Sequence, residues 1–295
     1  MTRLLLILAP CLAALAQSPA PIKIAAPCTE DDMQSLGMSC SADEPCKIYL
    51  ELSTLESVAN RILVAGNLHT SDITLSTVLL VSEDGGKTWN EPSPRIKSAS
   101  LDTMQFTDLQ HGWINGQHVQ SFPKDPFFLI TRDGGKSWRN IPVYNESRAG
   151  AVEKYFFENK DNGTMLLDRI QTGDAGRWGL YETRTGGDSW ELKQVTQRKP
   201  EFKKSAAHDP QWRLTAIGKT KIYHVEHRAG TKWDLVAAFN IEAGECKVTE
   251  RAPSIPPTEE NAGTEKIPEA GDKPKAPEAG DVFKIGPRTP PKKKQ

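Results

Sequence analysis

The chain has 295 residues, with 37 Lys and Arg against 38 Asp and Glu, so its formal net charge at pH 7 is −1. This balance disfavours a general role in binding nucleic acid or other polyanions, which usually needs a strong net field. Once both ends of the chain are set aside, the remaining residues are still enough to bury a sizeable core.

The first segment, residues 1–16, has a basic start, a short apolar run and a small-residue ending, which is typical of a secretory signal peptide. The run is too short, and too broken by Pro10, to cross a bilayer, and no later segment is long enough. We therefore expect an exported protein, secreted or periplasmic in a bacterial envelope, with no transmembrane span. Lipidation of Cys11 is the alternative, although a proline before the cysteine fits a lipoprotein signal poorly.

The next segment, residues 17–45, holds two of the four cysteines that remain after the signal peptide is removed, and Cys46 follows it directly. An even number of cysteines in an exported chain indicates two disulfides. Three pairings are open, and we favour Cys28–Cys40 with Cys46–Cys246, because a bridge from the first strand to the last closes the longest loop. A zinc site is the rival, and no Cys-x-x-Cys spacing supports it.

A repeat organises the middle of the chain. Three segments align in one frame, 78–91, 128–140 and 180–192, and 223–235 is a weaker fourth copy. The tryptophans that end the copies recur at spacings of 49, 52 and 43 residues, the size of one four-stranded propeller blade. These tryptophans are Trp89, Trp138, Trp190 and Trp233.

Each copy reads as a β-hairpin, in which an alternating apolar strand enters an Asp-Gly-Gly turn and leaves on a second short strand. Asp84 and Asp133 can accept hydrogen bonds from the amides of their own turns. The tryptophan beyond each turn can pack between neighbouring hairpins. Thr185 replaces the aspartate in the third copy, and Arg228 with Ala229 replaces Asp-Gly in the fourth, so we expect those turns to be less well fastened.

The pattern Ser82-x-Asp84-x-Gly86-x-Thr88-Trp89, repeated from Thr131 to Trp138, resembles the Asp-box, or BNR, repeat of sialidase-like β-propellers. Phe106 to Gly116 resembles a strand of the photosystem II stability/assembly-factor family and its relatives in non-photosynthetic bacteria. Because the box recurs while an active site occurs once, we assign it a structural role. Its residues are Ser82, Asp84, Gly86, Trp89, Thr131, Asp133, Gly135, Trp138, Gly187, Trp190 and Trp233.

The resemblance implies an all-β, β-propeller-like array of about four four-stranded antiparallel blades over residues 46–250. Those families usually carry six or more blades, so closure of four into a ring is open. The expected strands are 46–52, 60–66, 77–82 and 87–91; 99–106, 111–117, 127–132 and 137–143; 152–158, 164–170, 178–184 and 189–195; and 211–217, 220–226 and 232–239, with 245–250 pairing back onto the first. One short helical turn is expected within 29–40.

Binding residues are expected on the loops opposite the box turns, because an antiparallel meander places those connections on the other face. Three such loops are long, at 67–76, 117–126 and 171–177. The candidate binding residues on them are His69, Asp72, His118, Lys124, Asp125, Asp174 and Arg177.

From these features we expect a non-enzymatic scaffold that binds a protein or glycan partner through those loops. The alternative is a sialidase-like glycan hydrolase or a glycan-binding protein. For that alternative the resemblance implies three substrate-binding arginines and a tyrosine nucleophile beside a glutamate, although the Phe/Tyr-Arg-Ile-Pro motif is absent near the start. The residues available for these roles are Arg61, Arg169, Arg213, Tyr155, Glu153 and Glu158. A homodimer that completes the ring is a third possibility, because exposed strand edges need covering.

No motif indicates a cofactor or a catalytic metal. The six histidines are scattered, and His224 with His227 spans a strand end rather than one helical face. Lys160 to Gly163 reads as a turn rather than a calcium loop. The last segment, residues 251–295, is rich in Pro, Glu and Lys, which predicts a disordered tail that acts as a spacer or as a weak tether through Lys292 to Lys294.

Overall fold

A computed structural model describes residues 20–170, 176–206 and 208–247. The predictions made for residues 1–16, Cys11, Asp174 and residues 251–295 lie outside the described residues. Helix α1 (Glu30–Leu36) begins at Thr29, whose hydroxyl accepts the amide of Asp32 at 3.1 Å, and ends at Gly37 with a φ of +66°. In the part of the chain that the structure describes, no helix has the length and apolar character needed to cross a bilayer.

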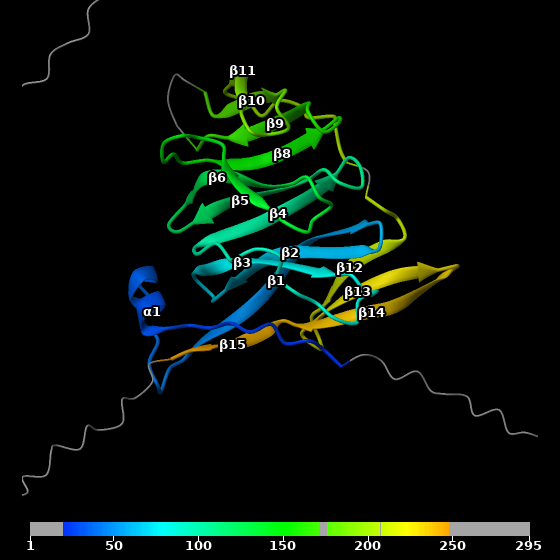
Figure 1. Ribbon diagram of the computed structural model, residues 1–295. Helices are drawn as coiled ribbons and strands as arrows, with labels where there is room; N and C mark the ends of the chain where they lie inside the picture. The colour runs from blue at the N-terminus through cyan, green and yellow to red at the C-terminus, as the bar shows by residue number, and fades with distance from the viewer. Residues whose placement is uncertain (1–19, 171–175, 207, 248–295) are drawn as a thin grey trace, which may run out of the picture. The chain divides into compact units, whose positions relative to one another are not determined.

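The strands form four antiparallel sheets, which confirms the all-β, propeller-like prediction (Figure 1). The first sheet has the order β15 (Glu242–Cys246), β1 (Cys46–Val58), β2 (Arg61–His69), β3 (Thr74–Ser82). The second sheet is β4 (Ala99–Phe106), β5 (Gly112–Val119), β6 (Pro123–Thr131), β7 (Arg139–Pro142). The third is β8 (Ala151–Phe157), β9 (Gly163–Asp168), β10 (Trp178–Thr183), β11 (Glu191–Thr196), and the fourth is β12 (Trp212–Ile217), β13 (Ile222–Ala229), β14 (Lys232–Asn240).

One predicted strand is wrong. Residues 87–91 do not form the fourth strand of the first sheet, and only a single bridge joins Val81 to Asn90. The reason is that Pro92 and Pro94 follow at once, and a proline has no N–H to continue a ladder. The sheet is completed at its other edge by β15, which pairs back onto β1 as the sequence predicted.

The sheets pack on one another through three apolar clusters. One cluster lies between the fourth and first sheets and includes Phe239 and Ile48. The next lies between the first and second sheets and includes Leu63 and Ile114, and the last lies between the second and third around Trp113. The sheets therefore follow one another in the order fourth, first, second, third (Figure 1). In the described part of the chain, no such cluster joins the third sheet to the fourth.

The repeated turns fasten one sheet to the next. In the first turn, the Asp84 carboxylate accepts the amides of Lys87 and Thr88 at 3.0 and 2.9 Å, and Asp133 does the same in the second. Gly86 and Gly135 have φ near +90°, and a Cβ at either would lie under 3 Å from a side chain of the neighbouring sheet. In the third turn the Thr185 hydroxyl accepts a single amide, that of Ser189, at 3.0 Å.

Among the described residues two disulfides are present, as predicted, but the favoured pairing of Cys28 with Cys40 and Cys46 with Cys246 is wrong. The bridges are Cys28–Cys246 and Cys40–Cys46. A turn from Ser41 to Glu44 brings Cys40 back onto Cys46, although Cys46 also lies opposite Cys246 in the sheet. Cys28 reaches Cys246 because the preceding segment is bound to β14 through Ile22. Such bridges are typical of an oxidising compartment outside the cytosol.

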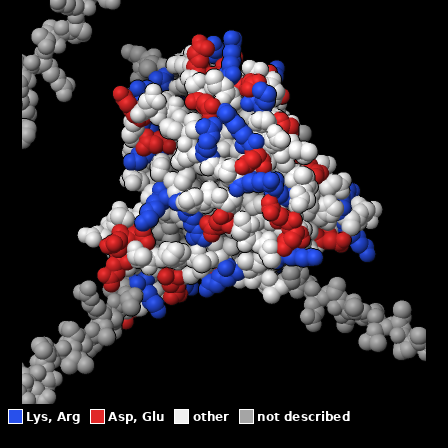
Figure 2. Space-filling model, viewed as in Figure 1, with Lys and Arg blue, Asp and Glu red and all other residues white. Residues whose placement is uncertain are grey.

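The charged side chains alternate in sign over the face shown in Figure 2, where Lys and Arg lie next to Asp and Glu rather than in separate patches. The described residues include ion pairs between exposed side chains, such as Arg132–Asp188 at 2.7 Å and Lys160–Asp161 at 2.7 Å. Pairs of this kind contribute little to stability individually. The sites of chemical interest therefore have to be sought where charged groups are buried.

Candidate functional site

The first strands of three sheets share an irregularity. The register shifts between Leu52 and Thr54 in β1, between Leu101 and Met104 in β4, and between Val152 and Lys154 in β8. Each bulge carries polar residues: Ser53, Asp102 with Thr103, and Glu153. Bulges re-aim side chains and are common next to active sites. These strands therefore present a set of polar groups that regular alternation would not place there.

Two cavities lie beside these strands. One, of about 270 Å³, is lined by residues of β4 and β8, including Glu153 and Tyr155, and by the segment 202–206. The other, of about 470 Å³, is lined by residues of β1 and β12. His208 and Thr103 line both cavities. The volumes are close to the lower part of the range typical of small-molecule sites, so we define these two cavities as the inner site.

His208 is held by a buried carboxylate. Its Nδ1 lies 2.6 Å from Oε1 of Glu56, which is 7 % exposed, whereas the His208 side chain is 61 % exposed. Burial raises the pKa of Glu56, and the hydrogen bond and charge of His208 oppose that rise. A carboxylate on one ring nitrogen fixes the orientation of the imidazole and leaves the other nitrogen for acid or base chemistry.

Asp102 is half-buried in a network of neutral groups. Its carboxylate accepts a hydrogen bond from Nδ2 of Asn115 at 3.2 Å and lies 3.5 Å from the Ser100 hydroxyl. The Asn115 side-chain oxygen accepts in turn from the amide and hydroxyl of Thr103 at 3.0 and 2.7 Å. Burial raises the pKa of Asp102, although hydrogen bonds from Gln117 and Ser100 oppose the rise. This network fixes the bulge that places Thr103 in the inner site.

Replacing Asp102 by Asn is expected to stabilise the protein increasingly as pH rises. The pKa of Asp102 is higher in the folded state than in the unfolded state. Such a carboxyl stabilises the folded protein in full at pH values below its unfolded-state pKa, and this contribution is lost as the pH rises through its folded-state pKa. The asparagine removes the titration, keeps one acceptor oxygen for Asn115, and can donate from its amide to the Ser100 hydroxyl. Urea unfolding of both proteins at about pH 4 and about pH 8 measures the difference in the free energy of unfolding, which should grow with pH. A difference that stays the same or shrinks as the pH rises would contradict the raised pKa of Asp102.

Tyr155 is unsuited to act as a nucleophile. It is a buried residue, and its hydroxyl lies 3.0 Å from the carbonyl oxygen of Thr103 and 2.9 Å from that of Trp113. Burial raises the pKa of Tyr155 well above its usual range, and the negative charges of Glu56 and Asp102 raise it further. The residue instead ties β8 to β4 beneath the inner site.

The three arginines of the sialidase-like alternative do not meet. Arg61 pairs with Glu83 at 2.7 Å, and Arg213 pairs with Glu226 at 2.7 Å and lies over the ring of Trp233. Arg169 follows β9, and its guanidinium lies 3.5 Å from the carbonyl of Gly176. The three lie in three different sheets. Of the two glutamates, Glu153 pairs with Lys199 and Glu158 with Lys204.

The candidate binding residues on the three loops have partners near their own strands. His69 Nδ1 lies 2.6 Å from the Thr70 carbonyl, Asp72 accepts from Ser71, and the His118 ring lies near Phe127. Lys124 forms a backbone bridge to Ala149, Asp125 accepts from Ser147 and Arg148, and Arg177 pairs with Asp168. None of these contacts, in the described ranges, joins one loop to another. Nor do three or more His, Cys, Asp or Glu side chains gather there as a metal site would require.

Sequence reasoning missed Glu56, Asp102 and His208. One signal was present, because the aligned first strands read Leu52-Ser-Thr, Leu101-Asp-Thr and Val152-Glu-Lys, with a polar pair where an apolar alternation should continue. His208 lies in the long connection from β11 to β12 and carries no such signal.

No protein-family model matches the chain. A curated relative, the oligoxyloglucan-reducing end-specific xyloglucanase of Emericella nidulans, is 25 % identical over 120 residues, which is 39 % of this chain and 14 % of that protein. Among solved structures, YCF48 bound to D1 peptide is similar with 16 % identity and a TM-score of 0.33, over 67 % of this chain and 55 % of that one. The α-L-arabinanase of Penicillium chrysogenum complexed with arabinobiose has 12 % identity and a TM-score of 0.35, over 74 % and 66 % of the two chains.

The sequence similarity to a xyloglucanase corrects one expectation. It overturns the prediction of a non-enzymatic scaffold that binds through the loops opposite the turns, and it favours the glycan-directed alternative instead. The chain matches only 14 % of that relative's length. The physical reason for the error is that the repeated residues form the turns that join neighbouring sheets. They carry no information on the polar residues at the bulges of the first strands.

Proposed function

We propose that this chain is an exported protein that binds glycans and cleaves a glycosidic bond at the inner site. The sequence similarity to a xyloglucanase supports the substrate class. The observation that carries the proposal is that Glu153, from the β8 bulge, and His208, backed by the buried Glu56, line one cavity. Two disulfides support export, and the hydrogen bonds of the Asp84 and Asp133 turns support a structural Asp-box role for them.

Hydrolysis of a glycosidic bond needs one group that donates a proton to the leaving oxygen and another that assists water or stabilises positive charge at the sugar carbon. His208 suits the first task because it lines the cavity, and Glu56 holds one ring nitrogen and leaves the other available for proton transfer. Glu153 suits the second because its carboxylate, paired with Lys199, lines the same cavity as His208. His208 gives its proton to the leaving oxygen as that bond breaks, water adds to the sugar carbon and gives a proton to Glu153, and proton exchange with solvent then restores both groups.

The test is the release of reducing sugar from a panel of glycans that includes xyloglucan, arabinan and sialosides. His208→Gln and Glu153→Gln should each lower the rate of release by about 10²- to 10⁴-fold, the usual contribution of an acid or base group. Glu83→Gln is the matched control, because Glu83 is an exposed partner of Arg61 outside the inner site. The proposal is refuted if the purified protein neither releases sugar from these glycans nor is retained by them. Equal rates for wild type and both site variants would refute the residue assignment.

A further inference from the structure

A third cavity, separate from the two of the inner site, lies where the third turn meets the second sheet. Its volume is about 380 Å³, within the range of small-molecule sites. One wall is the loop after β7, with Tyr144, Asn145 and Arg148, and the other is the third turn, with Asp188 and Trp190. None of these residues lines the inner site.

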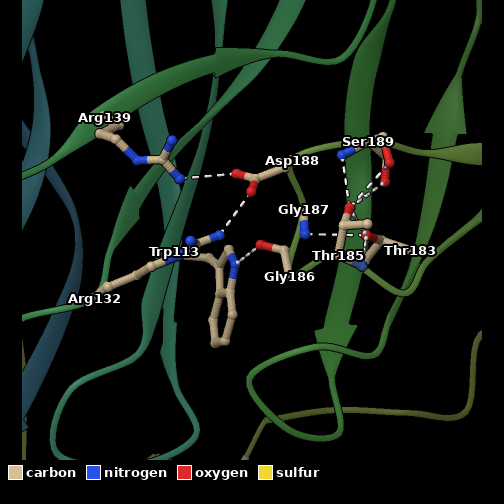
Figure 3. A network of polar contacts seen from close by, with 9 residues as sticks. All are labelled: Trp113, Arg132, Arg139, Thr183, Thr185, Gly186, Gly187, Asp188 and Ser189. Atoms are coloured by element: carbon tan, nitrogen blue, oxygen red, sulfur yellow. Dashed lines mark hydrogen bonds and ion pairs between the residues drawn. The ribbon is translucent and has the colours of Figure 1, made fainter.

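The wall formed by the third turn is fixed in place. The Asp188 carboxylate accepts hydrogen bonds from Arg132 at 2.7 Å and Arg139 at 2.8 Å, and the indole of Trp113 donates to the Gly186 carbonyl at 2.8 Å (Figure 3). Burial would raise the pKa of Asp188, but the two arginines outweigh it and lower that pKa. Asp188 is therefore an ionised group whose charge the two arginines balance, and it does not repel an anion from the cavity.

The opposite wall presents an arginine with spare charge. The Arg148 amide donates to the Asp125 carboxylate at 2.7 Å, and the Asp125 amide donates to the Arg148 carbonyl at 2.8 Å, which fixes the loop. The Arg148 guanidinium lies 5.4 Å from the centre of the Tyr144 ring. Its ion pair with Glu146 is long, at 3.6 Å, and both side chains are more than half exposed. Such a pair is weak, so the Arg148 guanidinium can leave Glu146 and bind another anion with little loss of stability.

Trp190 departs from the pattern of its repeat. The indole N–H groups of Trp89 and Trp138 donate to the carbonyls of Gly86 and Gly135 at 3.0 and 3.1 Å. The Trp190 ring instead stacks on Phe128, with centroids 5.3 Å apart, and its buried N–H has no acceptor among the described residues. A buried donor without a partner is unfavourable and calls for an oxygen acceptor at the site.

We infer that this cavity binds an acidic sugar unit, that is, a saccharide bearing a carboxylate. Arg148 pairs with the carboxylate, because a guanidinium binds carboxylates through charge-assisted hydrogen bonds. The Trp190 N–H donates to a ring or hydroxyl oxygen, and the Asn145 amide adds further hydrogen-bonding capacity on the loop wall. Arg132 and Arg139 balance the charge of Asp188, and the Arg148–Glu146 pair is long and exposed, so the Arg148 guanidinium is the group that favours an acidic sugar over a neutral one.

Isothermal titration tests this inference with trigalacturonate as the acidic probe and cellotriose as the neutral one. The full chain carrying His208→Gln is used so that hydrolysis at the inner site does not interfere. We expect saturable binding of trigalacturonate that is at least about ten-fold tighter than that of cellotriose, the difference that one charged hydrogen bond provides. Added salt should reduce that preference.

Arg148→Gln should abolish the preference, and Trp190→Phe, which keeps the ring and removes the N–H, should weaken trigalacturonate binding. Arg184→Gln is the matched control, since Arg184 lies in the same turn but does not line the cavity. The inference is overturned if the acidic probe does not bind, if both probes bind equally, or if Arg148→Gln binds like the control. Loss of hydrolysis in His208→Gln with trigalacturonate binding intact would separate this cavity from the inner site.

Discussion

Replacing Cys28 and Cys246 together by alanine is expected to lower the free energy of unfolding by about 5 kcal/mol, against about 2 kcal/mol for Cys40 and Cys46. The first bridge closes a sequence separation of 218 residues and the second a separation of 6, and a longer closed loop restricts the unfolded chain more. The long bridge also joins the segment before β1 to β15, so its removal loosens the edge of the first sheet that β15 forms.

Urea unfolding of the oxidised proteins without reductant measures both losses, and the melting temperature gives a second measure if the first variant is only marginally folded. The short-loop variant is the matched control, because it removes the same atoms from the same neighbourhood. Equal losses for the two variants, or a larger loss for Cys40 and Cys46, would contradict the loop-closure explanation.

Trp113→Ala is expected to destabilise the protein by about 3 to 5 kcal/mol, the usual effect of deleting a large buried aromatic side chain. Trp113 is 1 % exposed, and its ring stacks on Phe157 with centroids 3.8 Å apart and an angle of 8°. Its N–H donates to the Gly186 carbonyl, so one side chain joins the second sheet to both a strand and a turn of the third. The substitution leaves a cavity and an unpaired carbonyl between the two sheets.

Two further variants separate these contributions in chemical unfolding. Trp113→Phe keeps an aromatic ring and removes the N–H, so it should lose about 1 kcal/mol for the hydrogen bond in addition to the volume difference. Leu109→Ala, at a position that is 66 % exposed, should change the free energy of unfolding by less than about 0.5 kcal/mol. A loss for Trp113→Ala no larger than that of Leu109→Ala would show that the two sheets do not depend on this contact.

Much of the fold could be predicted because the repeat marks the same hairpin in each sheet. The strands of the second and third sheets lie within a few residues of their predicted positions, since a Gly-Gly turn and a tryptophan fix the frame. The predicted strand at 87–91 was lost to Pro92 and Pro94, which a period alone does not reveal. The cysteine pairing depended on a short turn at Ser41 to Glu44 and on the path of the segment around Ile22. Neither is visible in cysteine spacing.

The candidate site was predicted less well, for a physical reason. Glu56 and His208 are 152 residues apart and meet only because the fourth sheet packs on the first rather than on the third. No local pattern reports such a contact. The bulges at Ser53, Asp102 and Glu153 interrupt the alternation of buried and exposed residues, so a reading based on that alternation passes over the polar groups that they present.

The most direct test of the inner site is a crystal structure of the Glu153→Gln variant soaked with xyloglucan oligosaccharide, or with whichever glycan the wild-type protein cleaves. Sugar density should occupy the cavity lined by Glu153, Tyr155 and His208, with a glycosidic oxygen within hydrogen-bonding distance of the His208 ring. Sugar bound on the loops 67–76 and 117–126, with that cavity empty, would contradict the account.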